Sequence, residues 1–151
     1  MEQIIQLNNQ AKLSEHFTLG EFTKSNSHPE VYNIPSHEAI ANLKRLCIWL
    51  EVLRERSGGP VRINSGYRSP QLNRAIHGNA NSNHMTGCAC DIRVSGMEQA
   101  MRYAVILMDY ADESKQEFDE LLIERNRYGA IWVHFAVRPK ENRRKILFIN
   151  A

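Results

Sequence analysis

The fold is decided by residues 82–94, which read SNHMTGCACDIRV. Two potential metal ligands in this stretch, His84 and Asp91, lie seven positions apart. On a helix they would share a face but sit about 10 Å apart along the axis, too far to bind one ion at about 2 Å each. Gly87 between them is typical of a tight turn with positive φ. The stretch therefore predicts a turn that leads into a strand.

The side chains of residues 88–94 alternate as those of a strand do. The apolar set faces the core, and the other set carries Asp91 toward a site. Residues 130–137 alternate in the same way and carry His134. Two imidazoles and one carboxylate suit Zn²⁺, and three protein ligands leave a fourth position free, as in catalytic rather than structural zinc sites. His84, Asp91 and His134 are therefore predicted to form an open zinc site.

Some of these residues have simpler interpretations when they are taken alone. A lone His in a loop is more often solvated or packed in the core than bound to a metal. Cys88 and Cys90 could suggest a metal site, but both point away from Asp91 in the predicted strand. Cys47 makes the number of cysteines odd. Packing in the core is therefore favoured over a disulfide framework.

The rest of the chain predicts helices around this strand pair. Pro35-Ser36 introduces a helix that ends at Gly58-Gly59-Pro60. Its apolar stripe contains Ile40, Leu43, Cys47, Leu50 and Leu53. Residues 61–63 are predicted to be a short strand, and Ser69-Pro70 is typical of an N-cap followed by Pro at the first helical position, with a helix through about Ile76. Arg68 is thereby placed at a strand-to-helix junction.

A further helix is predicted around residues 98–110, with an apolar stripe that we expect in the core: Met101, Ala104, Val105 and Met108. Strands return from Asp119 to the end of the chain. The predicted fold class is α+β, with helices packed on a small, mostly antiparallel sheet that carries the zinc site.

The chain has 151 residues, enough to bury a sizeable core, and neither a linker nor a repeat divides it. We expect one domain over residues 1–151, with residues 1–12 as a candidate flexible segment. The net charge is only +2, which argues against nucleic acid as a partner. Five basic residues near the C-terminus are predicted to form a solvated face, with polyanion binding as the alternative: Arg138, Lys140, Arg143, Arg144 and Lys145.

Residues 1–6, MEQIIQ, lack the basic start and apolar run of a secretion signal. No segment approaches the roughly twenty apolar residues that cross a bilayer. The expectation is a monomer that is cytoplasmic when synthesised and has no membrane span.

Three motifs together resemble the M15 group of zinc D-Ala-D-Ala carboxypeptidases and related peptidoglycan peptidases. They are SGYRSPxLN at residues 65–73, SxHxxGxAxD at 82–91 and WxH at 132–134. Residues 13–22, LSEHFTLGEF, also resemble the opening segment of cell-wall and phage-encoded members.

This resemblance implies a fold of the Hedgehog and DD-peptidase type with a zinc ion held by His84, Asp91 and His134. It also implies that Arg68 contacts the substrate or the developing oxyanion. Two further residues of the same motifs, Ser82 and Trp132, are predicted to contact the substrate.

One position departs from the family pattern. Better-known members carry an acidic general base three residues before the last zinc His, where this chain has Ile131. The preceding predicted strand offers Glu120 and Glu124 on one face. A five-residue hairpin loop would place Glu120 opposite His134, and a seven-residue loop would place Glu124 opposite Trp132 and diagonal to His134. The sequence leaves the register open, and Glu124 is favoured because similar members carry an acidic residue there.

The implied function is zinc-dependent hydrolysis of a peptide bond in the peptidoglycan stem peptide or cross-bridge, of the D-Ala-D-Ala or L-Ala-D-Glu type. Two alternatives remain. The chain could bind a wall peptide through a zinc-containing module without cleaving it, or it could hold a purely structural zinc. A lysin released during phage or prophage lysis would fit both a wall substrate and a chain without a signal.

Overall fold

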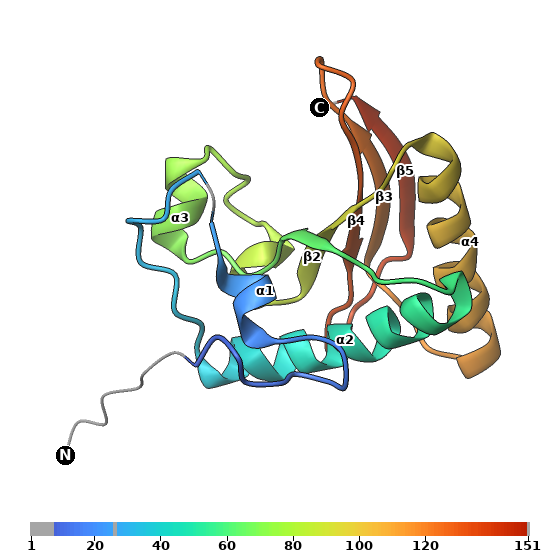
Figure 1. The fold of residues 1–151 in the computed structure, drawn as a ribbon, viewed down its shortest axis with the longest axis horizontal. Coiled ribbons are helices and arrows are strands. Elements are labelled where there is room, and N and C mark those ends of the chain that lie inside the picture. The colour runs from blue at the N-terminus through green and yellow to red at the C-terminus, as the bar shows by residue number, and fades with distance from the viewer. Residues whose placement is uncertain (1–7, 26, 151) are drawn as a thin grey trace.

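Five strands form one sheet in the order β1-β2-β4-β3-β5 (Figure 1). The computed structural model describes residues 8–25 and 27–150. The strands are β1 (Ile63–Ser65), β2 (Ala89–Arg93), β3 (Glu120–Arg125), β4 (Ile131–Ala136) and β5 (Lys145–Asn150). Neighbouring strands are antiparallel, except that β3 and β5 run parallel. The predicted mostly antiparallel sheet is therefore confirmed.

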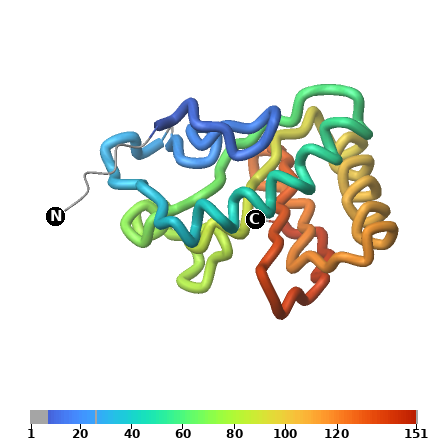
Figure 2. The backbone as a smooth tube through the Cα atoms, turned by 90° about the horizontal axis from the view of Figure 1, so that it is seen from below, coloured from blue at the N-terminus to red at the C-terminus, as the bar shows by residue number. Residues whose placement is uncertain are grey.

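In the described part of the chain, four α-helices and one 3₁₀ helix accompany the sheet in an α+β domain. They are α1 (Leu19–Thr23), α2 (His37–Ser57), α3 (Pro70–Ala75), η1 (Asn83–Thr86) and α4 (Met97–Ser114). Figure 2, which views the molecule from below, shows α2 running across most of its length, with α4 beside the C-terminal half of α2. Within the described residues, no helix combines the length and the apolar character needed to cross a membrane.

Helix α2 begins and ends where the sequence predicts. The Ser36 hydroxyl accepts a hydrogen bond from the Ala39 amide at 3.1 Å and caps the N-terminus. Gly58 ends the helix in the left-handed conformation, with φ of 77°. The predicted apolar stripe is buried, with Ile40 only partly so.

Aromatic packing joins α2 to α4 and to the sheet. The Trp49 ring lies 4.9 Å from the Tyr110 ring in an edge-on arrangement and 5.4 Å from the Phe135 ring. Phe118, just before β3, lies 6.2 Å from Trp49. The core therefore occupies one face of the sheet and takes the apolar residues of the strands, such as Ile92. The opposite face of β2, β4 and β3 remains for polar side chains.

The predicted core stripe of α4 is wrong for two of its four residues. Ala104 is buried and Met108 partly buried, whereas Met101 and Val105 are each 51% exposed. The buried row is instead Ala100, Tyr103, Ala104, Leu107 and Ala111. Successive helical residues differ by about 100° around the axis, so a row shifted by one residue leaves the contact face. Because both rows are apolar, the pattern alone favours neither.

The segments around Arg68 differ slightly from the prediction. The strand predicted at residues 61–63 forms at Ile63–Ser65, where Ile63 pairs with Ile92. Helix α3 starts as predicted, because the Ser69 hydroxyl accepts a hydrogen bond from the Leu72 amide at 3.1 Å. Arg68 therefore lies between β1 and α3.

The candidate flexible segment, residues 1–12, is described only from residue 8 onward. Within that part, the carbonyls of Asn9 and Ala11 accept hydrogen bonds from the amides of Gly20 and Leu19, both at the start of α1. Residues 1–7 lie outside the described part of the chain.

Gly87, the predicted turn residue, is required for two reasons. Its φ is +77°, and a Cβ there would collide with the Ala39 carbonyl oxygen of α2. We expect Gly87→Ala to lower the free energy of unfolding by at least about 2 kcal/mol, measured by denaturant titration. The matched control is Gly59→Ala, because a Cβ at Gly59 meets nothing within 4 Å. Equal stability of the two variants would contradict this explanation of the turn.

Candidate metal centre

Strand pairing brings Asp91 and His134 together. Asp91 on β2 is the direct cross-strand partner of His134 on β4, and their side chains project from the sheet face that the core leaves free. The Asp91 Oδ1 atom lies 3.1 Å from His134 Nδ1. The alternation predicted for residues 88–94 and 130–137 places Asp91 and His134 on the site face of their strands, and this is the face they occupy.

His84 enters from the turn before β2. It is buried in η1, where the Ser82 hydroxyl accepts a hydrogen bond from the His84 amide at 3.1 Å. The His84 Nδ1 atom lies 2.7 Å from the Gly66 carbonyl oxygen. With its proton on Nδ1, His84 can donate to this carbonyl. In this tautomer the lone pair of Nε2 points toward Asp91 Oδ1, 3.4 Å away.

His134 has a similar second partner. Its Nδ1 atom faces Asp91, and its Nε2 atom lies 2.9 Å from Glu120 Oε1. Metal-binding histidines commonly direct the second ring nitrogen at a carboxylate or a carbonyl, which fixes the tautomer and the orientation of the ring. Glu120 contacts the second ring nitrogen of His134, as the Gly66 carbonyl contacts that of His84.

The three side chains fit one metal ion. Their ligand atoms all lie within 4.8 Å of one another. Tetrahedral ligands at 2.0–2.2 Å from an ion are separated by about 3.3–3.6 Å, and the Asp91 oxygen lies 3.4 Å and 3.1 Å from the two histidine nitrogens, close to that range. The structure therefore brings His84, Asp91 and His134 into positions that could hold a metal through His84 Nε2, Asp91 Oδ1 and His134 Nδ1.

The β3–β4 register resolves the position of the two glutamates. Glu124 pairs with Trp132 and Glu120 with Ala136, so the register with seven residues between Glu124 and Trp132 is the one that forms. His134 pairs with Leu122. Because side chains two apart on a strand share a face, the glutamates lie on either side of Leu122, both diagonal to His134.

The two glutamates have opposite environments. A hydrogen bond with His134 outweighs burial and lowers the pKa of Glu120, and Asn83 donates a second hydrogen bond to it at 2.7 Å. Burial and the nearby Asp91 charge raise the pKa of Glu124. Within the described residues, Glu124 forms no ion pair. The Glu120 carboxylate is thus engaged with the candidate ligand His134, whereas the Glu124 carboxylate is not paired with a positive charge in the described part of the chain.

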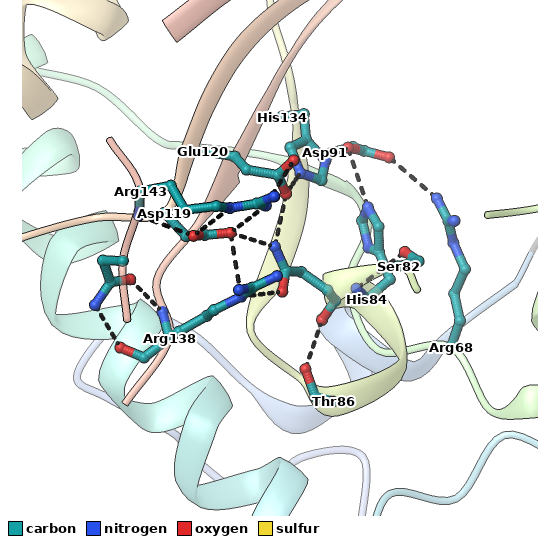
Figure 3. A network of polar contacts seen from close by, with 12 residues as sticks. Arg68, Ser82, His84, Thr86, Asp91, Asp119, Glu120, His134, Arg138 and Arg143 are labelled. Atoms are coloured by element: carbon teal, nitrogen blue, oxygen red, sulfur yellow. Dashed lines mark hydrogen bonds and ion pairs between the residues drawn. The ribbon is translucent and has the colours of Figure 1, made fainter. Parts of the chain in front are cut away.

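Arg68 lies against the outer oxygen of Asp91. Its Nη2 atom is 3.4 Å from Asp91 Oδ2, and its side chain is largely buried. Burial lowers the pKa of Arg68, while the charges of Asp91 and Glu124 oppose this shift. A guanidinium remains charged at any physiological pH. Arg68 therefore places a fixed positive charge beside the three candidate ligands (Figure 3).

Ser82 and Trp132, the two residues predicted to contact the substrate, also take part in the structure around the candidate ligands. Ser82 caps η1 and also lines the cleft above the candidate ligands. Trp132 is half-buried and pairs with Arg93 and Glu124 on its two neighbouring strands. Both lie near the centre, and their contact with a substrate stays a prediction.

The cleft is also lined by three of the basic residues that are predicted to form a solvated face. Its volume is about 540 Å³, and Arg138, Arg143 and Lys145 line it together with Arg68. A separate hollow of about 630 Å³ is lined in part by Arg54 and Arg62 and contains none of the three candidate ligands. The cleft of about 540 Å³ is therefore the one that contains the candidate metal site. Lys145 reaches the cleft because β5 pairs with β3, whereas Arg138 and Arg143 are held there by Asp119. No local sequence pattern reveals these contacts.

One family comparison bears on this arrangement. The family described as Peptidase M15 matches residues 15–134, which contain Arg68, all three candidate ligands and both glutamates. The chain belongs to the M15 peptidase family. No curated protein matches the chain. M15 peptidases are metal-dependent, so membership agrees with a cluster that could bind a metal. Residues 135–150 of this M15 peptidase, including all of β5, lie beyond the matched region.

Metal binding by this M15 peptidase should release a proton. Burial opposes a charge on His134, but hydrogen bonds with Asp91 and Glu120 outweigh it and raise the pKa to about 9. A metal must displace that proton, so we expect affinity for Zn²⁺ to rise with pH up to about pH 9 and then to level off. Calorimetry in buffers of different ionisation enthalpy should find about one proton released per ion at pH 7.

The matched variant for this measurement is Glu120→Gln. It removes one of the two carboxylates that raise the pKa of His134, so the pH at which affinity levels off should move downward. Zinc binding at pH 7 without proton release would contradict the assigned role of His134.

Proposed function

We propose that this M15 peptidase is a zinc enzyme that hydrolyses a peptide bond in the peptidoglycan stem peptide or cross-bridge, of the D-Ala-D-Ala or L-Ala-D-Glu type. The observation that carries the proposal is the pairing of an open three-ligand cluster with an available glutamate on the same sheet face. His84, Asp91 and His134 would hold the zinc. When bound, zinc polarises the scissile carbonyl and lowers the pKa of a water molecule.

Glu124 is proposed as the general base. Peptide hydrolysis needs a group that takes a proton from the attacking water and delivers it to the leaving amine. A pKa raised by burial brings a carboxyl closer to neutral pH, where proton transfer in both directions is efficient. Glu120 is less suited, because His134 and Asn83 already bind its Oε1 atom. Its proposed role is to orient His134.

Arg68 is proposed to bind the substrate. Its planar guanidinium can grip a carboxylate with two parallel hydrogen bonds or offset negative charge on the tetrahedral oxygen. The side chain is held between β1 and α3, and its backbone amide donates to the His84 carbonyl at 3.0 Å. This bond ties Arg68 to the segment that carries a candidate ligand. The guanidinium itself is held beside the candidate ligands by its contact with Asp91 Oδ2 at 3.4 Å.

The most informative test is mass spectrometry of a muropeptide digest with the purified zinc-loaded protein. Release of an amino acid or peptide would report activity and the bond that is cut. One observation favours a second candidate function, a wall-peptide binding module: Ile131 stands where better-known members carry their acidic base. Binding of muropeptides without any cleavage would support that candidate and exclude the peptidase.

Glu124→Gln should abolish hydrolysis while zinc and peptide binding persist. The amide is nearly isosteric but cannot take the proton of water at neutral pH. The measurement is turnover beside zinc content and peptide affinity. Glu120→Gln, the matched comparison on the same strand face, should slow hydrolysis less. A wild-type rate for Glu124→Gln would eliminate Glu124 as the base.

Arg68→Lys should lower turnover by roughly tenfold or more without loss of zinc, because Lys keeps the charge but loses the planar fork. Steady-state kinetics and metal analysis of the same preparation measure both effects. If Arg68→Lys and Arg68→Ala both turn over at the wild-type rate, Arg68 only holds its loop in place.

A further inference from the structure

The cleft extends past the metal centre to the edge of the sheet. In the strand order, β3 and β5 follow β4, so the wall formed by β5 lies two strands away from His134. Strands are spaced by about 4.8 Å, which places β5 roughly 10 Å from the strand of His134. Glu120 pairs with Lys145 on β5, so Lys145 projects on the same face as the candidate ligands.

A buried carboxylate fixes two guanidinium groups at this wall. Asp119 is fully buried, with 0% of its surface exposed. Its oxygens accept from Arg143 Nε at 3.0 Å and from Arg143 Nη2 at 2.8 Å, and Arg138 Nε lies 3.2 Å from Oδ2. Burial opposes the charge, but hydrogen bonds from Arg143 and Asn83 keep the pKa of Asp119 below its usual range. Asp119 therefore serves as an anchor and is not free to act in catalysis.

Both guanidinium groups keep donors for a ligand. No described residue forms a hydrogen bond with Nη1 of Arg143, or with Nη1 or Nη2 of Arg138. The Arg143 side chain is 48% exposed. Lys145 makes no ion pair within residues 8–25 and 27–150. The three cations face two carboxylates, Asp119 and Glu120, and Glu120 is also engaged by His134. At least one positive charge is therefore left over.

This wall lies across the metal centre from Arg68. Arg68 contacts Asp91 on β2, whereas Arg143 contacts Asp119 and approaches Glu120 on β3 at 3.6 Å. Figure 3 shows Arg68 on one side of the His84, Asp91 and His134 cluster, with Arg138 and Arg143 on the other. The cleft thus has one fixed cation beside β2 and three cations beside the start of β3, where Asp119 and Glu120 lie.

We propose that Arg138, Arg143 and Lys145 form a second carboxylate-binding wall, so that the preferred substrate carries one carboxylate on each side of the scissile bond. The inference rests on the proposed peptidase function and deepens it. Extended peptide rises about 3.3 Å per residue, so a reach of roughly 10 Å corresponds to about three residues. Leu147 and Ile149 follow Lys145 on the same strand face, which provides an apolar surface for small side chains between the charged ends.

The test uses four forms of the stem peptide L-Ala-γ-D-Glu-L-Lys-D-Ala-D-Ala. The D-Glu α-carboxylate and the C-terminal carboxylate are each left free or amidated. Affinity is measured by calorimetry on zinc-loaded Glu124→Gln protein, which should not cleave the peptides. We expect the form with both carboxylates free to bind at least tenfold more tightly than either singly amidated form, because amidation removes charge-assisted hydrogen bonds.

Adding single substitutions to this background separates the two ends of the cleft. The preference for a carboxylate is the ratio of the affinities for its free and its amidated form. Arg68→Gln should remove this preference for one carboxylate, and Lys145→Gln should weaken it severalfold for the other. Arg143→Gln should act like Lys145→Gln. Because Arg143→Gln also leaves Asp119 with fewer partners and could unfold the protein, Lys145→Gln alone decides the matter if that happens.

Lys140→Gln is the matched control, since it removes the same charge from a residue that does not line the cleft. It should keep both preferences. The proposal is overturned if Lys145→Gln keeps both preferences, if it affects the same carboxylate as Arg68→Gln, or if no form of the peptide binds.

Cleavage by the unsubstituted protein is followed in parallel by mass spectrometry. Cleavage without any preference for the second carboxylate would leave the peptidase function standing and overturn the second wall. Separable carboxylate preferences without any cleavage would overturn both, because no scissile bond would then lie between the two carboxylates. A scissile bond that does not lie between the two carboxylates would also overturn the inference.

Discussion

The pairing of Asp91 with His134 across β2 and β4 is the constraint on which the rest of the site depends. A slip of one residue between these strands would turn every side chain of one strand to the other face. His134 would then enter the core beside Trp49, and Phe135 would face the cleft. The packing of Phe135 against Trp49 at 5.4 Å opposes that slip. The apolar core therefore sets the geometry of the polar site on the reverse of the same strands.

The same alternation gives β3 two glutamates with different chemistry. Glu120 and Glu124 differ only in which end of the strand they occupy, yet one meets His134 and Asn83 and the other meets Asp91 and Trp132. Hydrogen bonds stabilise the charged form of Glu120, whereas burial destabilises that of Glu124. The division of labour proposed for them, between orienting a ligand and moving a proton, would thus follow from position alone, without any difference in residue type.

Much of the centre could be predicted from the sequence because local rules govern it. Alternation predicts the phase of Asp91 and His134, and Gly87 marks the turn that brings in His84. The β3–β4 register could not be predicted, because it depends on how the loop closes. There, Gly129 has φ of 85°, and the Asn126 side chain accepts hydrogen bonds from two loop amides. Several loop lengths fit that composition, and only tertiary packing selects one.

Which of the basic residues near the C-terminus line the cleft could not be predicted, for a different reason. Charge clusters in sequence are usually solvated, and nothing local distinguishes Lys140, which stays outside the cleft, from Lys145, which lines it. The difference arises because β5 adds to the sheet in parallel beside β3 and carries Lys145 into line with Glu120. The region matched by the M15 family ends at His134, before this strand. The metal centre is thus built from the family's shared segment, while one wall of the cleft comes from outside it. If the proposed second wall selects the substrate, changes in β5 would alter that selection without moving the candidate ligands, since β5 contacts β3 and not β2 or β4 in the sheet order.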